Sequence, residues 1–269
     1  MNLKTFGFIG CGNMGGALAA SVARTVGAEN LLLCDKDEAK ASALASRLGA
    51  STASAAELVS RADCIFLGVK PQMLADLLSD IREDVRARRT LPLFVTMAAG
   101  LTVSSVCRML DLDAPVVRIM PNTPVSVGEG MILYTVGKGV SDNSLSQLIS
   151  ALGGAGRLFE IAEEKIDAAS AVSGCGPAFA YLFIEALADA GVECGLARAD
   201  AITFASQMLL GSARLVLESG QHPGALKDAV CSPGGTTIAG VHALEEGGFR
   251  AAAMNAVVQA YKRTLELKK

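Results

Sequence analysis

Hydrophobic residues in the first half of the chain occur as short continuous runs, separated by stretches with helical spacing. The runs are typical of strands buried on both faces of a sheet and lie at 5–10, 30–35, 63–69, 91–97 and 115–120. Between them, alanine-rich stretches such as GGALAASVARTV place apolar residues three and four apart, as helices packed by one face do. The alternation predicts an α/β fold with a Rossmann-type, doubly wound parallel sheet. Further strands are expected at 130–136 and 156–162.

Strand signals stop after about residue 163, and the remaining pattern predicts helices only. They are expected at 163–172, 177–193, 198–219, 223–230, 236–246 and 249–267. This change predicts two domains, a dinucleotide-binding domain at 1–162 and an all-α domain at 163–269. The helix at 198–219 is apolar over most of its circumference, which is more than one supporting domain needs to cover. We therefore expect a second copy of the chain to cover it, which makes the all-α part a dimerisation domain.

Composition and charge narrow the possible functions. The chain has 269 residues and a net charge of -3, with no block of like charges, which argues against a nucleic-acid surface and favours a small-molecule ligand. The seven cysteines form no CxxC pair and no ligand cluster, so we expect reduced thiols, no metal site and a cytoplasmic location. The N-terminus lacks a signal-peptide layout. The uncharged run at 90–107 is interrupted by Pro, Gly, Ser and Thr, which favours a strand, a turn and a helix start over a membrane span.

The stretch FGFIGCGNMGGALAAS carries a G-x-G-x-x-G pattern at Gly10, Gly12 and Gly15, between the first predicted strand and the first predicted helix. In that setting the first glycine makes a tight turn, the second lets the backbone approach a pyrophosphate, and the third lets the helix pack on the strand. Asp35 ends the second predicted strand, where a carboxylate binds a ribose 2'-hydroxyl and repels a 2'-phosphate. The cofactor is therefore expected to be NAD(P)H, with NADH used at least comparably with NADPH. Lys36, directly after Asp35, would weaken that preference.

Two more loops, GVKP at 68–71 and MAAG at 97–100, follow predicted strands. The carboxyl ends of parallel strands line the ligand cleft, so both loops are expected to face the cofactor. The alternative is that Asp35, Lys36 and Lys70 are ordinary solvated turn charges. With Asn122 from MPNTP, the predicted cofactor-binding residues are Gly10, Cys11, Gly12, Asn13, Met14, Gly15, Asp35, Lys36, Gly68, Val69, Lys70, Pro71, Ala99 and Asn122.

The segment CSPGGTT at 231–237 combines unusual turn chemistry with a helix start. Pro233 and two glycines precede a threonine-rich beginning, which brings bare backbone N–H groups, hydroxyls and the positive helix end together. Such a place binds a small carboxylate without any arginine. An ordinary capped helix is the alternative.

Taken together, these motifs resemble those of pyrroline-5-carboxylate reductases, which make proline by reducing a cyclic imine with a nicotinamide cofactor. The resemblance extends over nearly the whole chain. It rests on FIGCGNMGGAL, GVKP, MAAG, MPNTP, SGCGPAF and above all LKDAVCSPGGTTIAGVHALEEGGFR, which is similar to the C-terminal signature of the family. The resemblance implies a Rossmann domain and a helical domain that intertwines with its partner's in a homodimer, assembled further in some members.

The resemblance also implies a substrate site. It places the substrate carboxylate against Ser232 and the backbone of Gly234, Gly235, Thr236 and Thr237. The hydroxyl of Thr237 would lie near the ring nitrogen, which makes Thr237 the catalytic candidate. Glu163 matches a position near the substrate in some members. Ala55 stands where some members have a ribose-contacting asparagine, so that contact is not carried over.

The residues that the chain lacks agree with this chemistry. Hydride transfer to a protonated C=N carbon neutralises an existing charge, so positioning supplies much of the catalysis without a strong base. The only two histidines, His222 and His242, are expected in structural or surface roles.

Two alternatives remain at this level. A β-hydroxyacid dehydrogenase needs a lysine in the helix after the SGCGPAF turn, where this chain has Ala180 and Tyr181. A non-catalytic dinucleotide-binding protein needs the glycine loop but not the SPGGTT segment, so the presence of both in this chain counts against that alternative.

Overall fold

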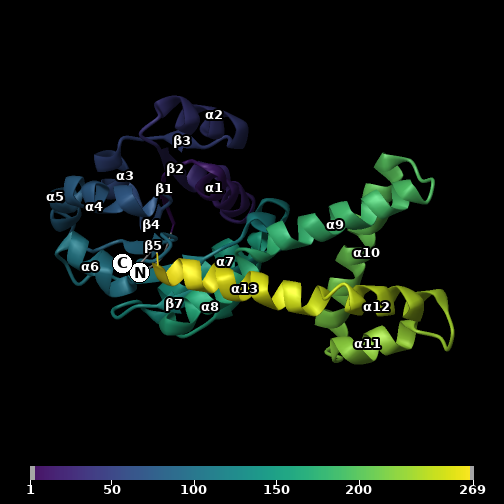
Figure 1. Ribbon diagram of the computed structural model, residues 1–269. Helices are drawn as coiled ribbons and strands as arrows, with labels where there is room; N and C mark the ends of the chain where they lie inside the picture. The colour runs from purple at the N-terminus through teal and green to yellow at the C-terminus, as the bar shows by residue number, and fades with distance from the viewer. Residues whose placement is uncertain (1–3, 267–269) are drawn as a thin grey trace. The chain divides into compact units, whose positions relative to one another are not determined.

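The computed structural model describes residues 4–266 of the chain (Figure 1). The described residues form two compact units. One runs up to Gly174 and also takes in the chain from Tyr261 on; it is called the sheet unit below. The other is Cys175–Ala260, called the helical unit.

The sheet unit is built on eight strands in the order β3-β2-β1-β4-β5-β6-β7-β8. The strands are β1 (Phe6–Ile9), β2 (Leu31–Cys34), β3 (Ser51–Thr52), β4 (Cys64–Leu67), β5 (Leu93–Thr96), β6 (Val116–Met120), β7 (Gly130–Val136) and β8 (Gly156–Glu160). Neighbouring strands are parallel except for β6 and β7. The chain leaves β1 toward β2 and returns to the other side of β1 as β4, so the direction of winding reverses there. Ligands of open α/β sheets bind at such a switch point.

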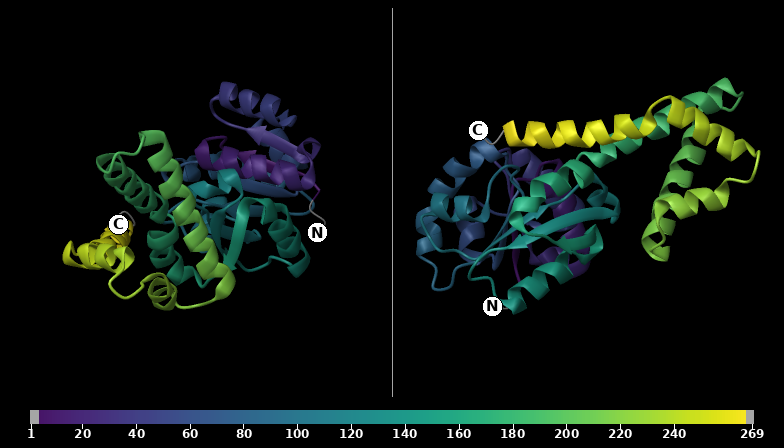
Figure 2. Two further views of the ribbon diagram at one scale, coloured as in Figure 1. Left: turned by 90° about the vertical axis from the view of Figure 1, so that its right-hand side faces the viewer. Right: turned by 60° about the horizontal axis from the view of Figure 1, so that its bottom comes forward.

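Helices cover both faces of this sheet (Figure 2). They are α1 (Asn13–Val26), α2 (Glu38–Leu48), α3 (Ala55–Arg61), α4 (Pro71–Asp80), α5 (Arg82–Arg86), α6 (Val103–Leu110), α7 (Asp142–Leu152) and α8 (Ile166–Ser173), with 3-10 turns η1 (Ala28–Asn30), η2 (Thr123–Val127), η3 (Gly153–Ala155) and η4 (Glu163–Lys165). Successive strand residues point to opposite faces. Phe8 and Phe66, stacked with ring centroids 4.3 Å apart, therefore pack with α1, α2 and α7. Ile65 and Leu67 pack with α3 to α6 on the other face.

The predicted strands are present, with ends that differ by at most two residues from the expected ones. The sheet is parallel as predicted apart from one pair, because β7 runs antiparallel to β6. The reason lies in the connection: only the short η2 turn joins the two strands, whereas a parallel return requires a crossover of about a dozen residues or more. The pattern predicts neither β3 nor α7.

The helical unit contains α9 (Gly176–Glu193), α10 (Arg198–Ser219), α11 (Pro223–Val230), α12 (Thr236–Glu246) and the first part of α13 (Phe249–Glu266). These bounds agree with the predicted helices; the expected end of the last one at residue 267 lies outside the described residues. α9 packs along α10. Large apolar side chains nevertheless stay exposed in the single chain, among them Leu182 at 69%, Leu217 at 65% and Met254 at 70%. This surface is too apolar for solvent and calls for a protein partner.

Candidate active site

The loop between β1 and α1 has the backbone geometry that the glycine pattern predicts. Gly10 has a φ of 104°, and its N–H donates to the carbonyl oxygen of Cys34 at 2.8 Å. A Cβ on Gly15 would lie 2.1 Å from the carbonyl oxygen of Gly10, so α1 starts this close to β1 only because residue 15 has no side chain. A Cβ on Gly12 would meet no atom within 4 Å. The space over Gly12, at the amino end of α1, is therefore open to a ligand.

The loop after β4 packs directly against this glycine loop. The N–H of Gly68 donates to the carbonyl oxygen of Ile9 at 2.7 Å, and a Cβ on Gly68 would lie 2.7 Å from the carbonyl oxygen of Gly10. Val69 follows, Lys70 is the N-cap of α4 and Pro71 is its first residue. The two loops thus meet backbone to backbone at the switch point of the sheet.

Asp35 holds the glycine loop against the end of β2. Its Oδ2 accepts the N–H of Cys11 at 2.6 Å, and its Oδ1 accepts the N–H of Asp37 at 2.9 Å. The sequence pattern does not predict these contacts. A carboxylate has about four acceptor positions, so two bonds of this kind leave room for ribose hydroxyls. Lys36 lies between these residues at the same turn.

Cys11 contributes a neutral thiol to the loop. Its Sγ donates to the carbonyl oxygen of Cys34 at 3.5 Å. Burial first, then the negative charge of Asp35 and then Cys34, raises the pKa of the Cys11 thiol to about 12. The thiol therefore stays protonated at physiological pH and adds no negative charge where an anionic pyrophosphate is expected.

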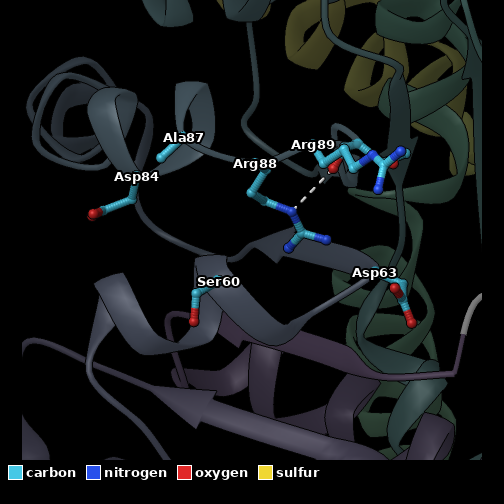
Figure 3. Close-up of a pocket in the computed structure, with 7 residues that line it drawn as sticks. Ser60, Asp63, Asp84, Ala87, Arg88 and Arg89 are labelled. Atoms are coloured by element: carbon cyan, nitrogen blue, oxygen red, sulfur yellow. Dashed lines mark hydrogen bonds between the residues drawn. The ribbon is translucent and has the colours of Figure 1, made fainter.

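A cavity of about 710 Å³ lies at the amino ends of the strands, away from the glycine loop, which follows the carboxyl end of β1 (Figure 3). Asp63 directly precedes β4 and Thr90 shortly precedes β5, so the cavity lies at the amino ends of these strands. Arg88 donates to the carbonyl oxygens of Thr90 at 3.1 Å and Ala62 at 2.6 Å. The carboxylate of Asp63 accepts the N–H of Lys4 at 2.9 Å. Arg88 and Asp63 thus hold main chain, and the predicted site residues are absent from the lining.

A cavity of about 770 Å³ opens beside the glycine loop instead, within the usual range for small-molecule sites. It is lined by Cys11, Gly12, Asn13, Gly16, Ala17, Ala20, Lys40, Ala43, Leu44, Arg47 and Ser126. Lys40 and Arg47 add two cations to the positive amino end of α1, although Lys40 also pairs with Asp37 at 3.4 Å. This combination favours an anionic ligand.

The predicted residues after β5 and β6 differ in how they are used. Ala99 lies in the loop between β5 and α6. The side chain of Asn122 is bound at both ends, because Nδ2 donates to the carbonyl oxygen of Ser173 at 2.9 Å and Oδ1 accepts the N–H of Met131 at 2.8 Å. Asn122 thus joins the end of α8 to the start of β7, and its side-chain amide is committed to main chain.

All predicted cofactor residues therefore follow the carboxyl ends of β1, β2, β4, β5 and β6, and the structure brings them to one edge of the sheet. Glu163 belongs to the same unit. Its Oε1 accepts the N–H of Val103 at 2.8 Å and lies 3.5 Å from Nη1 of Arg118. Nη2 of Arg118 lies 3.4 Å from Oδ1 of Asp167. Arg118 is not among the predicted site residues, although a single arginine in the apolar run PVVRIM is a usable signal.

The other predicted substrate residues form the turn before α12 in the helical unit. Gly234 has a φ of 67°, and the N–H of Gly235 donates to the carbonyl oxygen of Ser232 at 3.0 Å. Gly235 is the N-cap of α12 and makes no side-chain cap. The first N–H groups of a helix have no acceptor within it, so those of Thr236 and Thr237 are available to a ligand. A cavity of about 510 Å³ begins at this turn and continues along Gly234, Gly235, Ile238, Ala239, Val241, His242 and Glu245.

The two histidines differ in their place: His222 caps another helix, whereas His242 lines the cavity that begins at the turn before α12. His222 is the N-cap of α11, where its Nδ1 accepts the N–H of Gly224 at 3.0 Å. His242 is on α12, with Nε2 3.4 Å from Oε1 of Glu246, and both side chains are largely exposed.

Comparison with known proteins supplies the family. Residues 163–267 match a family model described as pyrroline-5-carboxylate reductase dimerisation. Residues 5–93 match one described as NADP oxidoreductase coenzyme F420-dependent. Over 269 residues the chain is 40% identical to the pyrroline-5-carboxylate reductase of Escherichia coli, with 99% of each chain covered. The chain belongs to the pyrroline-5-carboxylate reductase family. A member from Methanosarcina acetivorans is 39% identical over 272 residues, with both chains fully covered.

A solved structure agrees over its full length. The crystal structure of Plasmodium falciparum pyrroline carboxylate reductase with NADP bound superposes with a TM-score of 0.86 at 33% identity, with both chains fully covered. As a member of this family, the chain is an NAD(P)H-dependent oxidoreductase that reduces 1-pyrroline-5-carboxylate to L-proline. The predicted Rossmann sheet followed by a helical dimerisation domain is confirmed. The two alternative functions are not supported.

One helical stretch in the described part of the chain, at 163–193, is long and apolar enough to cross a membrane by length and composition alone. It lies within the match to the dimerisation model and begins with Glu163 and Asp167, both paired with Arg118. Its apolar surface is therefore explained by a homodimer interface.

Proposed function

We propose that NAD(P)H binds in the sheet unit at the carboxyl ends of β1, β2, β4, β5 and β6, which are called the cofactor edge below. We also propose that the turn before α12 binds the carboxylate of the imine. The observation that carries this proposal is that each unit has an open helix start, at Gly12 before α1 and at Gly234 before α12, where glycines leave backbone N–H groups accessible. Both places favour anions, a pyrophosphate at the first and a carboxylate at the second.

The residues proposed for each role are those of the sequence prediction. For the cofactor they are Gly10, Cys11, Gly12, Asn13, Met14, Gly15, Asp35, Lys36, Gly68, Val69, Lys70, Pro71, Ala99 and Asn122, where Asn122 acts through its main chain because its amide is already bound. For the substrate they are Glu163, Ser232, Gly234, Gly235, Thr236 and Thr237.

Thr237 is the proposed catalytic residue. When bound, NAD(P)H supplies the hydride that the imine carbon accepts. The chain's own part is to hold the carboxylate at the start of α12, with the Thr237 hydroxyl within hydrogen-bonding reach of the ring nitrogen. That hydroxyl donates to the nitrogen as its C=N bond becomes a single bond, or passes it a proton. No general base is needed, because the iminium is already protonated and positively charged, and the incoming hydride converts it into a neutral amine.

For the cofactor preference we propose that NADH is used at least comparably with NADPH. Asp35 directly follows β2 next to the glycine loop, where its carboxylate accepts the N–H of Cys11. A 2'-phosphate placed there meets a like charge, whereas a 2'-hydroxyl finds an acceptor. Lys36 and Lys40 oppose this effect in part.

For the organisation of the protein we propose that the domain boundary falls at 162/163, where the match to the dimerisation model begins, although the compact helical unit itself begins only at Cys175. The homodimer forms through residues 163–269, and the resemblance extends this to a larger homo-oligomer in some members. A cytoplasmic location is supported by the cysteines, which are all free among the residues that the structure describes.

Steady-state kinetics with 1-pyrroline-5-carboxylate test the proposal. We expect purified protein to turn over with both nicotinamides, and kcat/KM with NADH to be equal to or greater than that with NADPH. Absence of turnover with either cofactor, from protein shown to be folded by circular dichroism, would contradict the function.

A further inference from the structure

Arg118 is a cation inside the core of the sheet unit. It lies in the middle of β6, its side chain is only 1% exposed, and its strand neighbours Val117 and Ile119 belong to the hydrophobic core. Because side chains alternate along a strand, Arg118 points to the opposite face from these two. Burying a guanidinium is unfavourable unless anions compensate it, so the position requires partners.

Two carboxylates of the segment 163–167 are those partners. Glu163 and Asp167 are four residues apart, and Arg118 lies 3.5 Å from the first and 3.4 Å from the second. Both distances exceed the roughly 2.7–2.9 Å of tight charge-assisted hydrogen bonds. Nε of Arg118 has no hydrogen-bond partner among the described residues. Such a loosely joined buried triad is a poor source of stability compared with an apolar side chain of the same size, which points to a different role.

Glu163 connects the triad to a helix start. Its Oε1 accepts the N–H of Val103, the first residue of α6, at 2.8 Å. The N-cap Thr102 accepts from Ser105 at 3.2 Å through its own hydroxyl, so Val103 would have no acceptor without Glu163. A carboxylate is also favoured at the positive amino end of a helix. Glu163 therefore completes the cap of α6 from a segment sixty residues further along the chain.

The loop that leads into α6 lies at the cofactor edge. It runs from the end of β5 through Ala99 and Gly100 to Thr102, and Gly100 has a φ of 79°. Within it, the N–H of Leu101 donates to the carbonyl oxygen of Ala98 at 3.4 Å, and both residues pack against the core. The core thus anchors the loop at Ala98 and Leu101, and the start of α6 sets where its last residues, up to Thr102, lie.

We propose that Arg118 is a positioning residue for the dinucleotide. It holds Glu163 where that carboxylate caps α6, and so fixes the loop between β5 and α6 at the cofactor edge. The inference rests on the proposed binding of the dinucleotide at this edge. It also gives Glu163 a role toward the cofactor loop, in addition to the substrate position proposed above.

Binding and kinetics of matched variants test the proposal. Arg118→Lys keeps the charge but loses the planar fork, Glu163→Ala removes the cap, and Glu164→Gln is the control from an exposed neighbour. The dissociation constant of NADPH is measured by fluorescence titration without imine, and the KM for 1-pyrroline-5-carboxylate at saturating NADPH. We expect Arg118→Lys and Glu163→Ala each to raise the Kd about tenfold, and Arg118→Lys to change this KM by less than about twofold. Glu164→Gln should match the wild type in both.

A double-mutant cycle and a milder variant complete the test. If Arg118 acts through Glu163, Arg118→Lys adds no further loss of NADPH affinity in a Glu163→Ala background. Glu163→Gln keeps an acceptor for the N–H of Val103, so its Kd should lie between those of the wild type and Glu163→Ala, and it serves if Arg118→Lys fails to fold.

Three results would overturn the proposal: a raised KM for the imine with an unchanged Kd, a lower Tm with an unchanged Kd, or additive losses in the cycle. Failure of the wild type to reduce the imine would refute only the proposed function, because Kd is measured without imine.

Discussion

The sheet unit and the helical unit bury their apolar surface in different ways. In the sheet unit, α1 has six buried residues among 14, and the strands beneath it are almost completely enclosed. In the helical unit, α10 is longer, with 22 residues, but buries only Ala201 and Ala205. The first unit thus completes its core within one chain, whereas the second requires another chain to complete its own. The family's dimerisation model, at 163–267, includes all of the helical unit.

This difference has a consequence for the reaction. The proposed dinucleotide site uses loops whose geometry is fixed by contacts within one unit, while the proposed substrate turn belongs to the unit that a partner completes. Cofactor binding should therefore tolerate changes that abolish turnover. The predictions below separate the two units, beginning with the largest expected effect.

A charge in the middle of α10 should have the largest effect. Leu210 is 54% exposed in the single chain, and we expect Leu210→Asp to dissociate the dimer and to lower kcat/KM about a hundredfold or more, because a carboxylate is costly to bury at an apolar interface. Val127→Asp is the control, since Val127 is 75% exposed but lies in the sheet unit. Light scattering at micromolar concentration should show monomers only for Leu210→Asp. An unchanged dimer would show that this face of α10 lies outside the interface.

Substitutions at two glycines should separate folding of the cofactor loop from ligand binding. A Cβ on Gly15 clashes with the backbone of Gly10, so Gly15→Ala should lower the Tm and raise the Kd of NADPH about a hundredfold. Gly12→Ala meets no protein atom, so it should keep the Tm and raise the Kd about tenfold by obstructing the pyrophosphate. Calorimetry and fluorescence titration measure both quantities. Equal losses of Tm in the two variants would argue against an open ligand position over Gly12.

A smaller effect is expected at Asp35. Asp35→Ser should raise the ratio of kcat/KM with NADPH to that with NADH by about three- to thirtyfold, because a like charge near the 2'-phosphate is removed. The substitution also removes the hydrogen bond from the N–H of Cys11, which should weaken the binding of both cofactors. Taking the ratio cancels this shared loss. Asp37→Ser, two residues away, should change the ratio much less. An unchanged ratio in Asp35→Ser would show that another residue discriminates.

The smallest effect concerns the thiol of Cys11 and its reactivity. Burial is the main reason why the pKa of Cys11 is raised to about 12. At pH 8 the fraction of Cys11 present as thiolate should therefore be about a thousandfold smaller than that of an ordinary thiol with a pKa near 9. Peptide mapping after iodoacetamide treatment should find exposed Cys194 alkylated well before Cys11. Because the folded state favours the protonated thiol, the contribution of Cys11 to the free energy of unfolding is complete below pH 9. It is lost as the pH rises from about 9 to 12. Faster labelling of Cys11 than of Cys194 would contradict this.

Much of the fold follows from local patterns, and the exceptions have physical reasons. Strands such as β4 and β5 are uninterrupted apolar runs and were found from the sequence. β3 contains only two exposed residues, too few for any periodic signal. The antiparallel direction of β7 depends on the length of the preceding connection, which the hydrophobic pattern of the strands does not contain. For α7 the sequence does carry a signal: Ser141 caps the helix, and Leu145, Leu148 and Leu152 have helical spacing.

The site shows the same division between local and long-range information. The roles of Gly10 and Gly15 follow from a motif with a known geometry, and the structure reproduces them. The contact of Glu163 with Val103 joins residues sixty positions apart, and sequence spacing carries no information about it. Likewise, no pattern shows that both ends of the Asn122 amide bind main chain.

The central claim is that the helical unit acts on the imine while the sheet unit holds the cofactor. Comparing Thr237→Ala with Thr236→Ala tests it most directly, with kcat/KM for 1-pyrroline-5-carboxylate and the Kd of NADPH measured for each. We expect Thr237→Ala to lower kcat/KM by about ten- to a thousandfold, through lost positioning or proton donation, and Thr236→Ala to lower it much less, because alanine keeps the N–H. The Kd should be nearly unchanged in both. Equal losses in the two variants, or a loss in Thr237→Ala that a higher Kd explains entirely, would contradict the account.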